Sequence, residues 1–341
     1  MRFGVALPTC VEGMAYAIRF ADHEGVLRLA VLAEDLGFDS VLVNDHLSTM
    51  PYVREMFSEP PRFYEPMVTM AYIASHTSTL KMMTGVVVIP MREPVLLAKQ
   101  VATLDQISGG RIILGVGVGA YRAEFEAVYP ARRHAPRAEL VAEGIQAMKL
   151  LFEQRRATFE GEHFQFSDVE MFPKPLQSPF PIYSCGNAEG TIQRAAQWGA
   201  GWMPAGMPVE RLASGVEKLH DYAAAAGRPD VGFEVAPQLV LCLGRDPQAA
   251  MEKFTRSQAH EHLVSLRAST LKGIDMAGYA EQNLIGSPAQ VVERIERLRD
   301  AGATQLAGMI VVADDEQDMG EQMEMFAGEV MPHFAAEGVT A

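Results

Sequence analysis

The chain has 341 residues, 48% of them hydrophobic, and a formal charge of −14 at pH 7. This composition indicates a soluble protein with a large core, and no apolar run approaches the roughly 20 residues that a membrane-spanning helix requires. The acidic balance disfavours nucleic acid and an anionic membrane as partners, because both are bound through basic surfaces. The N-terminus opens on a strand and lacks the pattern of a signal peptide, so we expect a cytoplasmic protein whose ligand is small.

Eight segments have the apolar character of buried strands, and helical patterns separate them. In chain order, the predicted strands are residues 2–8, 39–43, 82–89, 112–118, 181–184, 201–203, 233–243 and 305–311. The predicted helices between them are residues 26–36, 65–76, 136–153, 190–198, 209–225, 246–266 and 287–302, together with a terminal helix. The third and fourth strands are apolar on both faces, and the helix between them starts at Glu93-Pro94 and ends at Ser108-Gly109-Gly110. This is the pattern of a parallel βαβ unit.

The alternation of strands and helices, without a glycine-rich fingerprint loop after the first strand, predicts an α/β protein. We expect one domain, residues 1–341, folded as a closed (β/α)₈ TIM barrel rather than an open doubly wound sheet. Two insertions are predicted: a hairpin over residues 157–168, before the fifth strand, and an irregular, lid-like segment over residues 266–286, after the seventh.

In a barrel of this kind, reactive groups lie where the strands end and the following loops begin. Asp45 and His46 follow the second strand, and a histidine at such a place is a candidate catalytic residue. We expect Asp45 to cap or orient it. The alternative is a structural histidine held by hydrogen bonds.

Glycines alternate at the end of the fourth strand, at Gly115, Gly117 and Gly119. Their missing side chains leave room for a flat ligand to approach the backbone. Relief of crowding inside the barrel explains them as well.

The turn from the fifth strand into its helix is a candidate phosphate site, because small residues at a helix N-terminus present free backbone N–H groups. Its residues are Gly186, Asn187, Ala188, Glu189, Gly190 and Thr191. An ordinary N-cap fits the same segment, and Glu189 repels a phosphate unless its side chain points outward.

Other sequence patterns argue against a metal site and against acyl or phosphoryl transfer. His260 and His262 lack the spacing of a zinc-binding helix, and we expect them on a solvated helical face. Cys10, Cys185 and Cys242 are odd in number and fit no metal spacing, so we expect reduced thiols in the core or in a pocket wall, and no metal. No nucleophile elbow or P-loop is present, which disfavours acyl and phosphoryl transfer.

The order of these features resembles the bacterial luciferase-like superfamily of flavin-dependent oxidoreductases. The matching stretches are GFDSVLVNDHL (37–47), TGVVVIPMREPVLLAKQVATLDQISGGRIILGVGVGAYRAEF (84–125), FPKP (172–175) and GNAEGTIQRAAQWGAGW (186–202). The resemblance implies a barrel, usually dimeric, that binds a flavin or deazaflavin at the C-terminal ends of its strands. It also implies a cis peptide at Gly85-Val86 behind the flavin ring, a phosphate at residues 187–191, and Gly119 and Tyr121 along the chain of the cofactor.

Three functions are compatible with this resemblance. We favour a monooxygenase that uses O₂ and reduced FMN supplied by a separate flavin reductase, with His46 as acid, base or hydrogen-bond partner. An F420-dependent reductase or dehydrogenase is the alternative. The sequence Asn44-Asp45-His46 and the residue Val118 favour it. A flavin-binding protein without turnover is the third. The predicted pocket walls, residues 48–64 and 266–286, suggest an apolar or aromatic substrate through Met50, Tyr52, Met56, Phe57, Phe63 and Met276.

Overall fold

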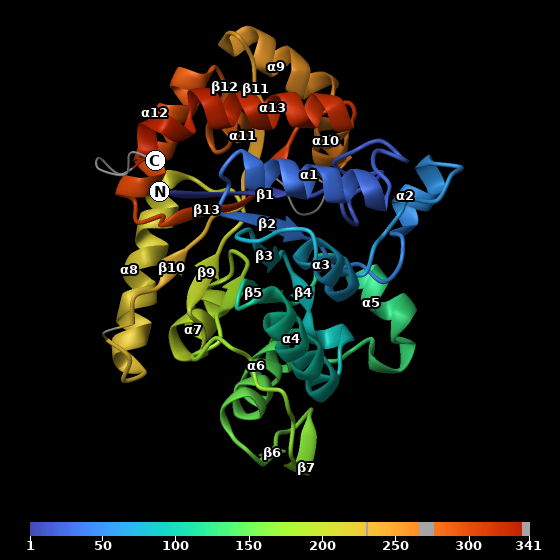
Figure 1. The fold of residues 1–341 in the computed structure, drawn as a ribbon, viewed down its shortest axis with the longest axis vertical. Coiled ribbons are helices and arrows are strands. Elements are labelled where there is room, and N and C mark those ends of the chain that lie inside the picture. The colour runs from blue at the N-terminus through green and yellow to red at the C-terminus, as the bar shows by residue number, and fades with distance from the viewer. Residues whose placement is uncertain (230, 266–275, 336–341) are drawn as a thin grey trace.

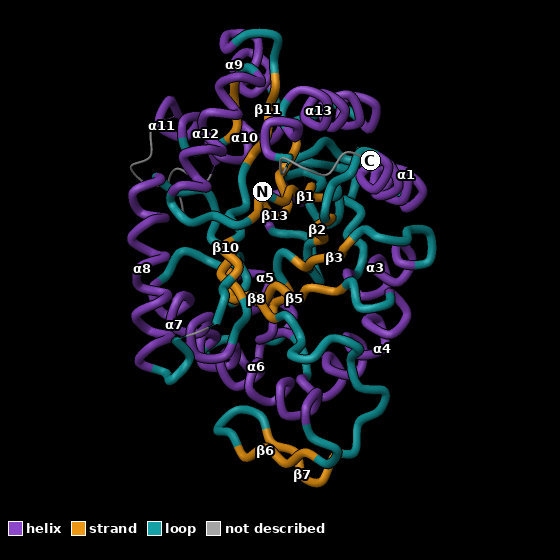
Figure 2. Tube along the Cα trace, turned by 60° about the vertical axis from the view of Figure 1, so that its left-hand side comes forward, coloured by secondary structure: helices purple, strands orange, loops and turns teal. Residues whose placement is uncertain are grey.

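The eight predicted strands are present in the computed structural model, which describes residues 1–229, 231–265 and 276–335 (Figure 1). Six are single strands: β1 (Arg2–Ala6), β2 (Ser40–Val43), β5 (Ile112–Gly117), β8 (Ile182–Cys185), β9 (Gly201–Met203) and β13 (Gln305–Val311). The third consists of β3 (Lys81–Thr84) and β4 (Val87–Val88), and the seventh of β10 (Glu234–Val235) and β11 (Val240–Leu243). Figure 2 shows these strands at the centre of the molecule with helices around them.

The two pieces of the seventh strand close the barrel. β10 pairs in parallel with β9, whereas β11 pairs in parallel with β13. The amide of Thr304 donates to the carbonyl oxygen of Val235 at 2.9 Å, and the amide of Ile310 donates to that of Leu239 at 2.8 Å. The remaining pairs run from β9 through β8, β5, β3, β2 and β1 to β13. The (β/α)₈ barrel expected from the sequence is therefore confirmed.

The barrel interior is filled by a small apolar cluster to which each of the eight strand positions contributes. Its members are Ala6, Leu42, Met83, Ile113, Tyr183, Cys185, Met203, Ala236 and Ala307. The larger core lies between the outer faces of the strands and the helices. Cys10, Cys185 and Cys242 are buried thiols, as expected.

In the part of the chain that the structure describes, eight helices cover the barrel: α1 (His23–Asp35), α3 (Pro66–Ala74), α4 (Pro94–Ser108), α6 (Arg137–Glu153), α7 (Glu189–Trp198), α8 (Val209–Ala225), α12 (Pro288–Asp300) and α13 (Glu316–Glu329). Their ends follow from local sequence. Glu93 caps α4 by accepting from the amides of Val95 and Leu96, and Gly109 ends that helix in the left-handed conformation, with φ 71°. Within the described residues, no helix combines the length and apolarity needed to cross a bilayer.

Several elements interrupt the simple alternation. The predicted hairpin is confirmed as β6 (Ala157–Glu160) and β7 (Gln165–Val169), which pair antiparallel and extend from the bottom of the view in Figure 1. Two short helices, α2 (Pro51–Met56) and α5 (Arg122–Val128), lie in segments predicted as loops. The helical stretch after β11 is broken into α9 (Pro247–Arg256) and α10 (Gln258–Ser265).

The structure describes only the second part of the predicted lid-like segment, residues 266–286. Residues 266–275 lie outside the described residues. The rest was predicted to be irregular, which is wrong: it contains α11 (Met276–Glu281) and a buried strand, β12 (Leu284–Gly286), which pairs with β11.

The carboxylate of Glu34, on α1, forms hydrogen bonds with the turn that leads into β3. Glu34 accepts hydrogen bonds from the amides of Ser78, Thr79 and Leu80 and from the hydroxyl of Thr79. Burial raises the pKa of this carboxyl, but the hydrogen bonds outweigh burial and lower it to about 2, below the ordinary 4.5. The ionised form therefore stabilises the folded state.

We expect Glu34→Gln to lower the free energy of unfolding by about 1–3 kcal/mol at pH 7, because charged acceptors make the stronger hydrogen bonds. The contribution of Glu34 is complete above about pH 4.5 and is lost as the pH falls towards 2. Chemical denaturation should therefore show a smaller difference between the two proteins at pH 3. Glu24→Gln, at an exposed position on the same helix, is the control and should change little. Equal losses at both pH values would contradict this prediction.

Candidate active site

A cavity of about 350 Å³ opens at the C-terminal ends of the barrel strands. Many of the predicted site residues line it: Asp45, His46, Gly85, Val86, Gly117, Gly119 and Gly186. Cys185, Met203 and Gln238 add to its wall without having been predicted to bind a ligand. The rule that reactive groups gather at the ends of barrel strands therefore predicted this grouping.

The third barrel strand is interrupted at the edge of this cavity. β3 ends at Thr84 and β4 begins at Val87, and the peptide between Gly85 and Val86 is cis, as the resemblance implied. The side-chain amide of Asn44 donates to the carbonyl oxygen of Gly85 at 2.8 Å. The Thr84 hydroxyl donates to the carbonyl oxygen of Gly115 at 2.8 Å. Polar side chains thus fix the chain on both sides of the interruption.

The three alternating glycines accommodate this interruption in two ways. A Cβ atom on Gly115 would lie 2.1 Å from the carbonyl oxygen of Thr84, so crowding alone demands glycine there. A Cβ on Gly117 would lie 3.0 Å from a methyl of Val86, and one on Gly119 would lie 2.8 Å from a methyl of Val88. Gly117 and Gly119 also line the cavity. Relief of crowding therefore explains the first glycine, and both interpretations apply to the other two.

Asp45 is held by the residues that follow the interruption. Its carboxylate accepts from the amide of Val88 at 3.0 Å and from two guanidinium nitrogens of Arg92 at 2.9 and 2.6 Å. The side chain of Asp45 is only 1% exposed, and Arg92 forms a second ion pair with Glu65. Asp45 thus anchors the backbone at the cavity edge. The carboxylate that contacts His46 is a different one.

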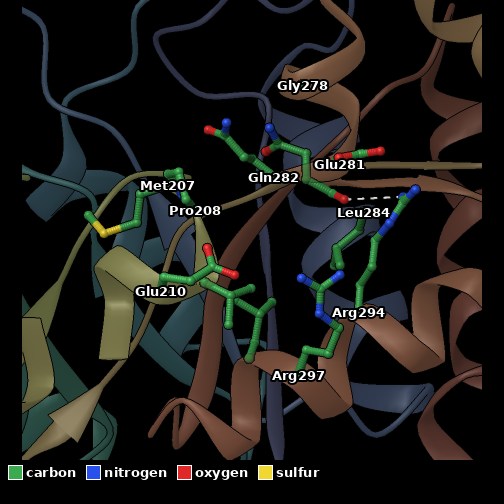
Figure 3. A pocket seen from close by; sticks show the side chains of 12 residues that line it. Met207, Pro208, Glu210, Gly278, Glu281, Gln282, Leu284, Arg294 and Arg297 are labelled. Carbon is green, nitrogen blue, oxygen red and sulfur yellow. Dashed lines mark hydrogen bonds between the residues drawn. The ribbon is translucent and has the colours of Figure 1, made fainter. Parts of the chain in front are cut away.

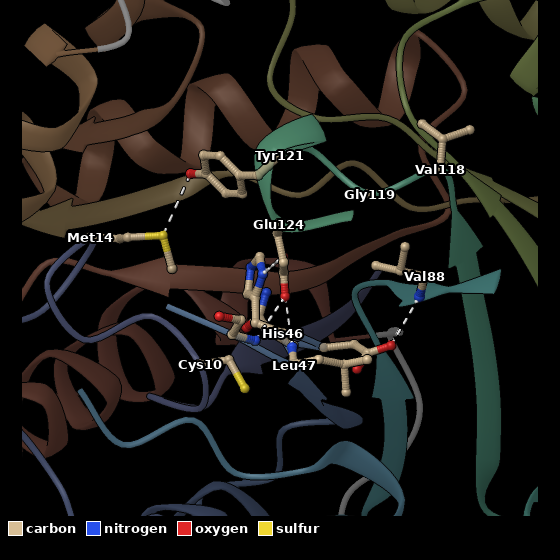
Figure 4. A network of polar contacts seen from close by, with 12 residues as sticks. Cys10, Met14, His46, Leu47, Val88, Val118, Gly119, Tyr121 and Glu124 are labelled. Atoms are coloured by element: carbon tan, nitrogen blue, oxygen red, sulfur yellow. Dashed lines mark hydrogen bonds and ion pairs between the residues drawn. The ribbon is translucent and has the colours of Figure 1, made fainter. Parts of the chain in front are cut away.

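His46 is oriented by Glu124, which the sequence did not single out. Nδ1 of His46 lies 2.7 Å from Oε2 of Glu124, and Oε1 of Glu124 accepts from the amides of Leu47 and Ser48 at 2.7 and 3.1 Å (Figure 4). Glu124 is buried on α5, in a segment predicted as a loop. Since a carboxylate can only accept, the Nδ1–H tautomer of neutral His46 fits this contact, and the lone pair then lies on Nε2.

A second group of polar side chains lies beside His46. The ring of Tyr121 is 5.6 Å from the His46 ring, and its hydroxyl is 3.4 Å from Nε2 of His262 and 3.5 Å from the hydroxyl of Tyr52. Tyr121 is not among the residues that line the cavity. The expectation that His260 and His262 lie on a solvated face is wrong: His260 packs against Phe254, and His262 stacks on Tyr52.

The predicted phosphate turn lies at the N-terminus of α7. Ala188 is its N-cap and provides no side-chain hydrogen bond. Glu189 points to α8, where it pairs with Lys218 and Tyr222. Nη2 of Arg194, one turn along α7, donates to the hydroxyl of Thr191 at 3.2 Å. Its buried Nε has no hydrogen-bond partner among the described residues, so the sequence missed a cation that faces this turn.

The predicted pocket-wall residues differ in how deeply they are buried. Met50 is fully buried in a cluster with Met14 and Val53, against which Tyr52, Phe57 and Phe63 pack. Met56, in contrast, is 56% exposed. The cluster forms apolar surroundings next to Tyr121.

A second cavity, of about 210 Å³, lies between the start of α8 and the segment from α11 to α12 (Figure 3). Arg294 and Arg297 of α12 project towards it. Nη1 of Arg294 donates to the carbonyl oxygen of Asn283 at 3.3 Å and to that of Ile285 at 2.6 Å. None of the predicted site residues lines this cavity.

The sequence matches the model of a family described as luciferase-like monooxygenase over residues 1–305. It is 28% identical over 319 residues to the F420-dependent glucose-6-phosphate dehydrogenase of Kineococcus radiotolerans, covering 89% of this chain and 90% of that protein. It is also 28% identical to the FMNH₂-dependent dimethylsulfone monooxygenase of Pseudomonas putida, covering 89% and 86%. The crystal structure of monooxygenase RslO1 from Streptomyces bottropensis superposes with a TM-score of 0.81 at 25% identity, covering 98% of this chain and all of that one.

We expect Asp45→Asn to lower the free energy of unfolding by about 3 kcal/mol, because removal of one partner leaves the charge of Arg92 partly uncompensated in a buried place. Denaturant titration at pH 7 measures this loss. Asp300→Asn, in an exposed pair with Arg299, is the matched control and should change stability by less than about 0.5 kcal/mol. Similar small effects in both variants would show that Asp45 does not anchor the site.

Proposed function

Because the chain belongs to the luciferase-like monooxygenase family, we propose that it is a monooxygenase that uses reduced FMN and O₂ to oxidise a small organic substrate. One observation carries this proposal: a histidine paired with a buried carboxylate lies on the wall of a glycine-lined cavity at the strand ends. Two similar proteins, one 28% and one 25% identical, are named monooxygenases, which supports this choice among the activities of the family.

The cavity lining fits a flat ring, and the turn that follows Gly186, itself a lining residue, fits a phosphate. Gly117 and Gly119 leave the floor without side chains, so a planar ring has access to the backbone beside Gly85 and Val86. The amides at the start of α7 and the hydroxyl of Thr191 suit a phosphate, and the unpartnered Nε of Arg194 suits an anion there. Bound reduced FMN supplies the two electrons with which O₂ is activated.

His46 is the residue that we propose handles protons during the reaction. Glu124 holds Nδ1, so Nε2 accepts a proton from substrate or releases one to it. The positive charge that forms on the imidazole is then compensated by the buried carboxylate at 2.7 Å. Asp45 positions the neighbouring backbone, since its own charge is already matched by Arg92.

An F420-dependent reductase or dehydrogenase is the second candidate. The F420-dependent relative covers the chain as well as the monooxygenase relative does, and the Asn44-Asp45-His46 sequence leans the same way. His46 then takes or gives the proton that accompanies direct hydride transfer. A flavin-binding protein without turnover is disfavoured, because it has no use for an imidazole backed by a buried carboxylate.

We further propose a cytoplasmic homodimer that receives reduced FMN from a separate flavin reductase. Exposed apolar side chains support a second copy as partner: Val68 on α3 is 69% exposed, and Leu96 and Ile107 on α4 are 60% and 58% exposed. Leu96 and Ile107 are separated by three helical turns, so they lie on one face of α4.

The choice of cofactor is tested by titrating the purified protein with FMN, reduced FMN and F420 under anaerobic conditions, followed by absorbance and fluorescence. We expect reduced FMN to bind more tightly than F420, and oxygen consumption to require it. Arg194→Met should weaken binding of the phosphate-bearing cofactor about tenfold or more, because it removes a charge-assisted hydrogen bond. Lys218→Met, whose charge is already paired with Glu189, is the control. Tight F420 binding with anaerobic turnover would instead establish the second candidate.

Replacement of the proton-handling residue tests the mechanism. We expect His46→Ala to lower kcat by about 10²–10⁴-fold while cofactor affinity changes little. Glu124→Gln should cause a smaller loss in the same direction, because it removes the charge that stabilises the protonated imidazole. Glu126→Gln, at an exposed position on the same helix, is the matched control. Full activity in His46→Ala would remove this residue from the mechanism.

A further inference from the structure

Gln238 lies in the wall of the cavity at the strand ends, in the connection from β10 to β11, and is half-buried. Its side-chain amide makes no hydrogen bond to any residue that the structure describes. The other side chains of the wall that carry a nitrogen, an oxygen or a thiol each have such a partner: Asn44, Asp45, His46 and Cys185. The two N–H donors and the carbonyl acceptor of Gln238 are therefore open to a ligand in the cavity.

The backbone on both sides of this side chain is held by hydrogen bonds. The amide of Gln238 donates to the carbonyl oxygen of Pro204 at 2.9 Å, and Gln238 pairs in parallel with Ala205. The carbonyl oxygen of the next residue, Leu239, accepts from the amide of Ile310 at 2.8 Å. Because the backbone is already fixed, a ligand that binds the side chain has only the side chain to order, which favours binding.

The wall of this cavity is an arc of strand ends rather than a complete ring. The lining residues lie at the ends of β2, of the strand formed by β3 and β4, and of β5, β8, β9 and β10, which is also their order in the sheet. None of the described lining residues comes from β1, β13 or the loops that follow them. His46 is at one end of the arc and Gln238 at the other, whereas Gly117 and Gly119 are near its middle. A flat ring against these glycines leaves both ends of the arc to a substrate.

The charges around Gln238 favour a neutral ligand. The described lining residues include no lysine or arginine, and the carboxylate of Asp45 is already paired with Arg92. The neighbouring strand end contributes the apolar residues Met203 and Ala205 to the same wall. An anion beside Gln238 loses hydration without gaining a countercharge. A carboxamide is neutral and carries an N–H donor next to a carbonyl acceptor, so it can form two hydrogen bonds with the amide of Gln238.

We propose that Gln238 is a specificity-determining residue, and that the substrate is a neutral molecule with a carboxamide or lactam group that Gln238 binds through two hydrogen bonds. The substrate then lies between Gln238 and His46, the residue proposed to handle protons, with the cofactor ring against the glycines. This assignment rests on the proposed function for the reaction and deepens it by naming the substrate class. Binding of a carboxamide is measurable without turnover.

Three probes of similar size test the assignment: benzamide, which is neutral and carries the carboxamide, toluene, which lacks polar groups, and benzoate, which is an anion. Their binding to the full chain is measured by ligand-observed NMR titration under anaerobic conditions, with and without reduced FMN. We expect benzamide to bind about tenfold more tightly than toluene or benzoate, because only benzamide forms both hydrogen bonds.

Replacement of Gln238 separates recognition of the substrate from the shape of the cavity. Gln238→Met keeps the length of the side chain and removes its amide, so it should abolish the benzamide preference while the affinities for toluene and for reduced FMN stay unchanged. Gln248→Met is the matched control, because Gln248 is exposed on α9 and its amide is bonded to Glu252. This control should keep the preference.

Similar affinities of benzamide and toluene for the unaltered protein would overturn the proposal, and so would a benzamide preference that survives in Gln238→Met. Equal losses of benzamide and toluene affinity in that variant would report a changed shape and also contradict it. A tenfold loss of reduced-FMN affinity would assign the amide to the cofactor ring instead of the substrate. Failure of both FMN and F420 to bind the unaltered protein would count against the proposed function alone, because the probe titrations without cofactor do not depend on it.

Discussion

The third barrel strand stops at Thr84 and resumes at Val87, and the geometry of the site depends on how the chain is held across that interval. Asn44 binds the carbonyl of Gly85, and Asp45 binds the amide of Val88. Both residues directly follow β2, whose last residue, Val43, is in register with Thr84. The pairing that builds the sheet therefore also delivers the two side chains to the interruption. His46, the next residue, is placed on the cavity wall by the same alignment.

Much of this arrangement could be predicted because its signals are local. Apolar runs bounded by glycine and proline located each strand, and the rule that parallel strands end at one face of a barrel grouped His46 with Gly85, Gly117 and Gly186. The seventh strand shows where such signals stop. Its apolar pattern runs from Phe233 to Leu243, and Pro237-Gln238 interrupts it without showing that the chain leaves β9 and joins β13 there. That change of neighbour is a property of the closed sheet.

The missed residues share a different cause, which is that their partners are distant in the sequence. Glu124 lies on a short charged helix and looks like its neighbour Glu126, which is exposed and paired with Arg122. Only the fold, which brings α5 over the loop after β2, distinguishes the two. The residues next to His262 in the sequence have the polar composition of an exposed helix, yet its ring packs on Tyr52, 210 residues earlier in the chain. Periodicity reports which face of a helix is polar and cannot report what covers it.

The site holds two buried carboxylates whose partners give them different roles. Asp45 faces Arg92, whose guanidinium keeps its charge throughout the accessible pH range, so this pair is permanent and can serve as an anchor. Glu124 faces the imidazole of His46, a ring with two nitrogens that can each donate or accept a hydrogen bond. In the proposed mechanism, the second pair passes between one net charge and none when His46 takes up or releases a proton, while the first pair does not change. That mechanism would place an invariant ion pair beside a variable one, so that the proton moves without disturbing the backbone that positions His46.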